Sequence, residues 1–154
     1  MRLYESLVMS TMLYSAELWP LTILQKKKLD AAHHKFQRRL LGITWKDKVC
    51  NEDIQNQTKL QRMDLIIKER RLRWLGHVLR MKDDRIPKQA TRWQMDSCTR
   101  RRAGRPRLNW IDTVTRDLKS TGMAWEDAEQ ATVDREDWRG RVAQCVFDTG
   151  WTKV

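Results

Sequence analysis

The sequence predicts an all-α protein, an irregular bundle of about five to seven helices with an exposed arginine-rich loop. Only 6 Gly and 3 Pro interrupt its 154 residues. Strict alternation of apolar and polar residues, which is typical of half-buried strands, is scarce, whereas apolar residues recur at intervals of three and four. These observations favour helices over sheets along most of the chain.

Two helices are expected in the first 42 residues. The first ends near Pro20, and its apolar residues recur at helical spacing: Leu3, Leu7, Val8, Met12 and Leu13. Thr22 suits the N-cap of the second helix, and Gly42 suits its C-terminal stop. The apolar or small residues of this second helix are Leu29, Ala32, Phe36 and Leu40.

The strongest helical periodicity runs from residue 60 to residue 81. One apolar stripe contains Leu60, Met63, Ile67, Trp74, Val78 and Met81, and a second contains Leu65, Leu72 and Leu79. Arg62, Arg73 and Arg80 lie between the two stripes. A helix with two apolar stripes packs on two sides, so this helix is expected at the centre of the fold with its arginines along a narrow strip.

Shorter helices are expected elsewhere. One begins near Asn51, another covers residues 89–94, and three more contain Trp110, Trp125–Ala131 and residues 134–146, the last capped by Asp134. Residues 95–107 are almost free of apolar side chains and are expected to form a loop. The chain is therefore divided into a helical domain of residues 1–94, a basic loop of residues 95–107 and a small helical segment of residues 108–154.

The charge of the chain is strongly positive and unevenly distributed. There are 31 Lys and Arg against 20 Asp and Glu, a formal net charge of +11. Residues 61–110 carry 15 basic and 5 acidic side chains, whereas residues 111–154 carry 6 and 9. A concentrated basic block of this kind usually serves an anionic partner, most commonly nucleic acid.

The remaining composition indicates a soluble protein of the nucleus or cytoplasm. The three cysteines are far apart and odd in number, which favours a reducing compartment over a disulfide framework. No apolar run approaches the ~18 residues of a membrane span, and the amino terminus lacks the pattern of a signal peptide. We therefore expect no membrane association.

The arginine-rich loop is the sharpest functional signal. Its arginines are Arg100, Arg101, Arg102, Arg105 and Arg107. Guanidinium groups chelate phosphate oxygens and stack on bases, so phosphate contact is the preferred interpretation. A solvated or nuclear-import-like basic run is the alternative. Gly104, Arg105 and Pro106 also match the core of an AT-hook, which inserts arginines into a narrow minor groove, but three residues leave that mode open.

Further candidate contacts lie on the expected helices. The long helix carries Lys68, Arg70, Arg71, Arg73 and Arg80, for which nucleic-acid contact and ordinary surface salt bridges are equally good interpretations. Lys26, Lys27 and Lys28 stand in a first helical turn, where the helix dipole disfavours cations, and this hints at an anionic partner. Among the eight tryptophans, Trp45 and Trp93 occupy loop or break positions and are candidates for base stacking.

We predict no catalysis, no metal and no cofactor. The three histidines and three cysteines do not have zinc-ligand spacings, and His77 is interpreted as a histidine at the edge of an apolar stripe. No paired aspartates of a two-metal polymerase are present. Asp83 and Asp84 follow a helix within a basic context and fit a salt-bridge site better than a metal cradle.

Several motifs together resemble one family. Residues 13–22 (LYSAELWPLT) and 39–49 (RLLGITWKDKV) resemble segments that follow the polymerase core in non-LTR, LINE-like retrotransposon reverse transcriptases. Residues 70–81 (RRLRWLGHVLRM) give the most specific match, and residues 84–90, 101–110 and 125–139 continue the series in family order. The resemblance covers nearly the whole chain.

The resemblance implies the thumb and carboxyl-terminal region of such an enzyme, with residues 1–94 as the thumb-like part. In that context the chain grips a template–primer or target, so the expected partners are RNA, DNA or an RNA–DNA hybrid. The endonuclease, fingers and palm would lie upstream, and their catalytic aspartates are not in this sequence. The missing polymerase domain, or a second copy of the chain, is a further expected partner, and a non-catalytic protein-interaction or structural fragment is the alternative function.

Overall fold

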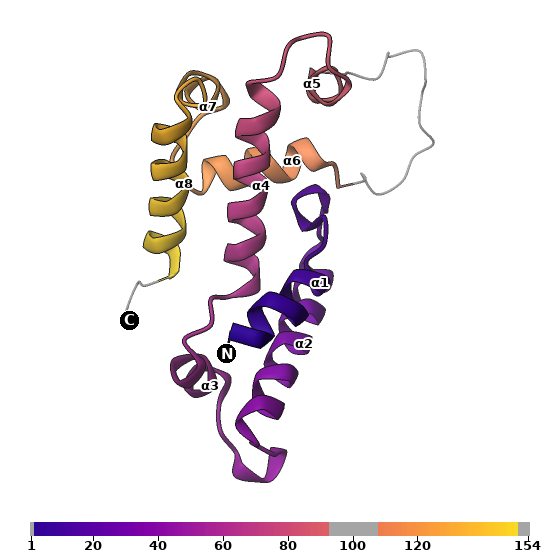
Figure 1. The fold of residues 1–154 in the computed structure, drawn as a ribbon, viewed down its shortest axis with the longest axis vertical. Helices are drawn as coiled ribbons and strands as arrows, with labels where there is room; N and C mark the ends of the chain where they lie inside the picture. The colour runs from indigo at the N-terminus through magenta and orange to yellow at the C-terminus, as the bar shows by residue number, and fades with distance from the viewer. Residues whose placement is uncertain (1, 93–107, 151–154) are drawn as a thin grey trace.

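The computed structural model describes residues 2–92 and 108–150, with side chains to residue 144, and its regular elements in these ranges are all helical. This confirms the predicted fold class, with somewhat more helices than expected (Figure 1). The α-helices are α1 (Ser10–Met12), α2 (Ile23–Leu41), α3 (Asn51–Thr58), α4 (Met63–Leu79), α5 (Ile86–Arg92), α6 (Trp110–Lys119), α7 (Trp125–Ala131) and α8 (Arg135–Gly150). A π-helical segment, η1 (Tyr4–Met9), precedes α1. Two short 3-10 helices are η2 (Ala16–Leu18) and η3 (Trp45–Asp47).

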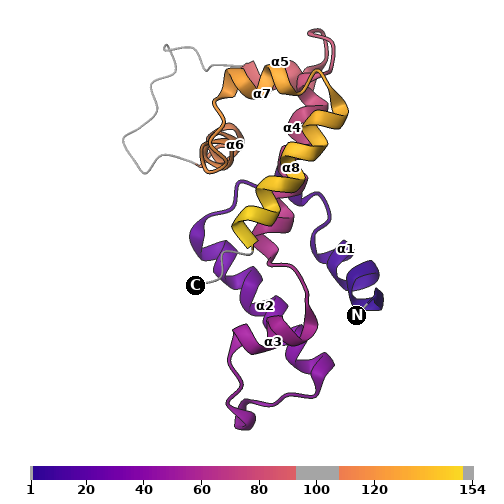
Figure 2. The ribbon, with the colours of Figure 1, turned by 90° about the vertical axis from the view of Figure 1, so that its left-hand side faces the viewer.

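Helix α4 is the central helix of the described structure, and most of the other elements pack against it. Figures 1 and 2 show α8 running alongside α4, α6 crossing it, and the amino-terminal helices gathered around its first half. The most extensive contact of α4 is with α8, followed by η2. The expectation that this helix packs on two sides is confirmed, because Leu65 and Leu72 of one stripe and Met63 and Val78 of the other are all buried.

The first half of α4 belongs to an apolar core built with the amino-terminal segment. The buried members of this core are Tyr4, Met9, Leu13, Ala16, Leu60, Met63 and Ile67. The intervals Tyr4 to Met9 and Met9 to Leu13 are five and four residues, which reflects the wider π-helical turn at this point. The predicted stripe assumed an α-helical period, and its members Leu3 and Leu7 are instead 77% and 63% exposed.

The second half of α4 belongs to a separate core with α6, α7 and α8. Its buried residues are Leu72, Leu75, Val114, Leu118, Ala128, Trp138 and Val142. The Trp138 indole Nε1 donates a hydrogen bond to the Leu72 carbonyl at 3.0 Å. Gly76 allows this approach, since a Cβ at position 76 would lie 2.3 Å from Trp138 Nε1.

The ends of α2 form as the sequence predicts, but its buried face does not. Thr22 and Gln25 form a reciprocal capping box, and Gly42 ends the helix at φ +69°. Phe36 and Leu40, expected on the buried face, are 41% and 52% exposed. His33 and Gln37 are buried in their place, because they form a polar network with Tyr4 that the apolar pattern could not reveal.

The later helices agree closely with the sequence. Helix α7 has the predicted bounds, and Asp134 caps α8 by accepting hydrogen bonds from the backbone amides of Glu136 and Asp137 at 2.8 and 3.3 Å. Helix α5 begins at Ile86 and ends at Arg92, so it starts earlier than the short helix expected at residues 89–94. Within the described ranges, no helix is both long and apolar enough to cross a membrane.

Candidate nucleic-acid interface

The basic side chains of α4 have very different surroundings. Arg71 is 1% exposed, and its guanidinium pairs with Asp117 of α6 and donates to the Trp19 carbonyl at 3.3 Å. Arg70 is half-buried and donates to the Leu13 carbonyl at 2.9 Å. Arg71 is therefore not a surface residue, contrary to its expected place among the contact residues, and Arg70 serves the packing of the amino-terminal segment.

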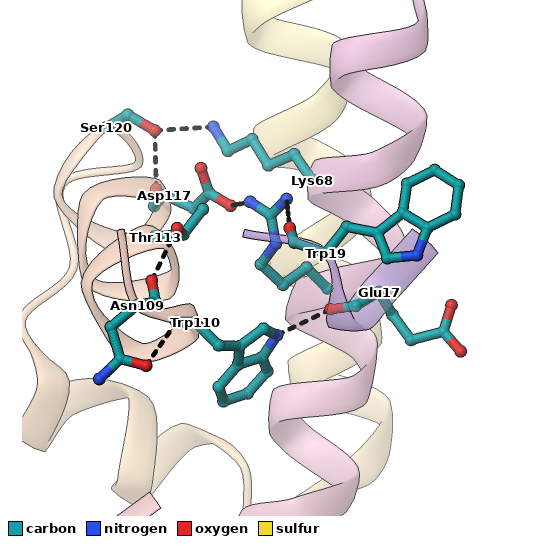
Figure 3. Close-up of polar contacts among 9 residues, drawn as sticks. Glu17, Trp19, Lys68, Asn109, Trp110, Thr113, Asp117 and Ser120 are labelled. Carbon is teal, nitrogen blue, oxygen red and sulfur yellow. Dashed lines mark hydrogen bonds and ion pairs between the residues drawn. The ribbon is translucent and has the colours of Figure 1, made fainter. Parts of the chain in front are cut away.

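The Arg71–Asp117 pair is the centre of a polar junction among α4, α6 and η2 (Figure 3). Lys68, which is 8% exposed, donates to the Ser120 hydroxyl at 2.9 Å. The Trp110 indole donates to the Glu17 carbonyl at 2.8 Å and ties the start of α6 to η2. These polar contacts thus hold α4, α6 and η2 together.

Arg73 and Arg80 remain at the surface. Arg73 pairs with Glu69 one turn earlier on the same helix, and its side chain is 60% exposed. Arg80, just beyond the end of α4, donates to the Thr132 carbonyl at 3.0 Å. Partial burial and the nearby positive charge of Arg135 lower the pKa of Arg80. Arg80 is therefore held in place beside a second cation.

A groove of about 490 Å³ lies at this end of α4. It is lined by His77, Arg80, Met81, Lys82, Asp84 and Arg85. Its three arginine and lysine side chains, Arg80, Lys82 and Arg85, are accompanied in the lining by one carboxylate, Asp84. None of the three forms an ion pair with a carboxylate of the described residues. The groove is thus a concentration of positive charge that the described carboxylates compensate only in part.

Asp83, next to the groove residue Asp84, forms ion pairs with cations that do not line the groove. Asp83 pairs with Lys88 at 3.0 Å and with Arg92 at 3.2 Å, as the predicted salt-bridge role requires. The hydrogen bond from Lys88, with the charges of Lys88 and Arg92, lowers the pKa of the Asp83 carboxyl. Asp83 is therefore ionised and forms its ion pairs with residues of α5, and it does not line the groove.

Lys26 of α2 borders a second hollow, of about 330 Å³, at the other end of α4. Lys26 lines it together with Arg62 and Lys68, but Asp64 and Asp117 line it as well. Arg62 pairs with Asp64 at 2.9 Å, so much of the charge is balanced internally. Positions 62 and 80 are separated by roughly 27 Å along the helix at 1.5 Å per residue, so the two basic regions are distinct hollows at opposite ends of α4.

The remaining candidates are only partly located. Lys27 and Lys28 are exposed on α2, and Trp45 is 83% exposed in η3, far along the chain from the groove. Trp93 and the five loop arginines, Arg100, Arg101, Arg102, Arg105 and Arg107, lie outside the described residues. The described part contains no cluster of three or more potential metal ligands.

Sequence reasoning overlooked three groove residues, His77, Lys82 and Arg85. His77 was interpreted only as an edge histidine, yet it is exposed beside Arg80. The spacing of His77 and Arg80, three residues apart on a helix, was the signal that could have found the groove, because such side chains are neighbours. Arg85 has no comparable signal, since the turn at Lys82 that places it cannot be read from periodicity.

Comparison with known proteins gives one informative similarity. A Caenorhabditis elegans protein described as uncharacterized and transposon-derived is 27% identical over 146 residues, which cover 88% of this chain and 51% of that protein. The chain thus spans about half the length of this relative, and the similarity supports a transposon-related origin. No family profile matches the chain, and no solved structure matches it.

Proposed function

We propose that this chain is a nucleic-acid-binding region of a retrotransposon reverse transcriptase, corresponding to the thumb and the segment that follows it. The transposon-derived relative supports the origin, and the motif series of the sequence supports the particular enzyme. The role is binding of RNA, DNA or their hybrid, without catalysis by this chain.

The observation that carries the proposal is the groove at the end of α4. Arg80, Lys82 and Arg85 present positive charge that the described carboxylates leave largely uncompensated. Like charges held together destabilise a protein unless an anion joins them, and a nucleic-acid backbone supplies such anions at regular intervals. The proposed contact set is therefore this groove with the arginine-rich loop, and it omits Arg71.

The test is a binding titration of the full chain with a variant in which Arg80, Lys82 and Arg85 are changed to Gln. Loss of three phosphate contacts should reduce the magnitude of the log–log salt slope by about 2 on single strands and about 3 on duplex. A matched variant, Arg2→Gln with Arg116→Gln and Lys119→Gln, removes the same charge from exposed positions outside the groove. Equal slopes for the two variants would refute the groove as the binding site.

A second candidate function is protein interaction through the amino-terminal segment. Leu3, Leu7 and Tyr14 are 77%, 63% and 78% exposed there, and large apolar side chains gathered on a surface mark interaction sites. The occupant would be the polymerase domain or a second copy of the chain.

Self-association provides the test of this second function. Changing Leu3 and Leu7 to Gln should shift the chain toward monomer in sedimentation without lowering its thermal stability. A matched change of the equally exposed Ile86 and Val133 to Gln should leave association as it is. A wild-type chain that stays monomeric at high concentration would argue against association through this face.

A further inference from the structure

The groove contains an aromatic ring as well as cations. Trp74, His77 and Arg80 follow one another at intervals of three residues, so their side chains are neighbours along one face at the end of α4. The Trp74 and His77 rings pack together, with centroids 5.3 Å apart and planes inclined by 46°. The half-buried Trp74 thus supports one side of the His77 ring, while His77 itself is exposed and lines the groove.

The His77 imidazole is not used by the fold. Among the residues that the structure describes, none forms a hydrogen bond with its ring nitrogens, and aromatic contact with Trp74 is its clear interaction. This contrasts with the buried His33, both of whose ring nitrogens have partners. An exposed ring that is held by a neighbour, and has no structural hydrogen bond, offers a flat surface for stacking.

Three cations line the groove together with His77. Arg80 follows His77 by one turn and is fixed by its hydrogen bond to the Thr132 carbonyl, and Lys82 and Arg85 continue the lining of the groove. The backbone amide of Arg85 donates to the Lys82 carbonyl at 3.1 Å, which folds the segment after α4 into a turn. One aromatic ring with several adjacent cations is the combination that binds an unpaired base and its phosphates.

We propose, resting on the proposed function, that this groove binds single-stranded nucleic acid, with an unpaired base stacked on His77 and the adjoining phosphates on Arg80, Lys82 and Arg85. The bases of a duplex are already stacked on each other and present only their edges in the grooves, so they cannot use the His77 ring. The His77 ring therefore adds affinity for single strands alone, whereas the three cations can contact the phosphates of a single strand or a duplex.

The test compares His77→Ala with His77→Phe in the full chain, using oligouridylate, oligothymidylate and a mixed-sequence DNA duplex. Loss of one stacked base should weaken binding of both single strands by about 5- to 150-fold. Phe retains a flat ring and should restore most of the affinity, and duplex binding should change little in either variant. His77 is exposed, so both variants should keep the wild-type melting temperature, which circular dichroism checks.

The outcomes separate this inference from the function on which it rests. Unchanged single-strand affinity in His77→Ala, or an equal loss on duplex, would overturn the stacking inference. The broader proposal would survive that result if the Arg80, Lys82 and Arg85 variant still weakened binding to every nucleic acid. Absence of binding by the wild-type chain to all three probes would overturn both.

Discussion

Gly76 of α4 and Trp138 of α8 lie in direct contact, and the indole occupies the space that a side chain at position 76 would need. A Cβ there would meet Trp138 Nε1 at 2.3 Å and Cδ1 at 2.5 Å. Trp138 is 2% exposed and is anchored by its hydrogen bond to the Leu72 carbonyl, so it has little freedom to move. The close packing of α4 and α8 therefore depends on glycine at this position.

Gly76→Ala should destabilise the protein even though alanine is the better helix former. Overpacking a filled core costs about 1–3 kcal/mol, which exceeds the gain in helix propensity. The control is Gly140→Ala, since nothing lies within 4 Å of a Cβ at that exposed position of α8, and it should be neutral or stabilise by up to about 1 kcal/mol. Urea denaturation of both variants measures the difference, and equal effects would contradict the packing described here.

Arg71 should matter for folding, unlike its neighbour Arg73. Removing Arg71 leaves Asp117 buried without its partner, and breaking such a pair costs about 3–5 kcal/mol. Arg71→Met should therefore lower the free energy of unfolding strongly, and the double change Arg71→Met with Asp117→Leu should recover much of the loss. Arg73→Gln removes an exposed pair with Glu69 and should cost less than about 1 kcal/mol. Equal costs for Arg71→Met and Arg73→Gln would contradict the assignment of Arg71 to the interior.

Stability should fall at mildly acidic pH because of His33. Burial, together with the charge of His34, lowers the pKa of His33 from 6.5 to about 4. The Gln37 amide donates to Nε2 of His33, which leaves Nδ1 as the donor to the Tyr4 hydroxyl, so a second proton would break the network. A histidine with a lowered folded-state pKa contributes its full stability above pH 6.5 and loses it as the pH falls toward 4.

The predicted loss over this range is at most on the order of 3 kcal/mol. His33→Gln cannot titrate, so the difference in unfolding free energy between wild type and variant should shrink across this pH range. Carboxyl groups, including Asp30, titrate in both proteins and cancel in the comparison. A difference that stays constant from pH 7 to pH 4 would show that His33 does not have the lowered pKa.

The arginine-rich loop should contribute to binding independently of the groove. Changing Arg100, Arg101, Arg102, Arg105 and Arg107 to Gln should leave the helical content intact. The salt slope should flatten by roughly 3 to 4, if about four phosphate contacts are lost at 0.7 to 0.9 each. A loss confined to A·T-rich duplex would instead indicate an AT-hook, and an unchanged slope would identify the loop as a solvated run.

Local signals predicted local structure well. The Thr22 capping box, the Gly42 stop and the bounds of α7 follow from short-range chemistry that the sequence displays. The faces of the helices were less predictable wherever a distant partner decides them. His33 is buried because Tyr4, 29 residues away, accepts its hydrogen bond, and Arg71 is buried because Asp117, 46 residues away, neutralises it.

For the candidate site too, the sequence revealed local features but not the contacts between distant residues. Basic composition made α4 and its surroundings a candidate for anion binding, but it could not distinguish an arginine that holds the fold from one that faces solvent. Arg71 and Arg80 look alike in the sequence, yet the first has an ionic partner in the core and the second lines the groove. The groove itself depends on the turn after α4, which brings Lys82 and Arg85 beside His77.

The most direct test of nucleic-acid binding is the affinity of the wild-type chain for single-stranded RNA, single-stranded DNA, duplex and RNA–DNA hybrid over a range of salt concentrations. Counterion release predicts that the logarithm of the association constant falls linearly with the logarithm of salt. Three groove cations and five loop arginines would give a slope of roughly −5 to −6 on single strands, at about 0.7 per contact. Absence of binding at low salt, or a slope near zero on every substrate, would contradict the proposed function.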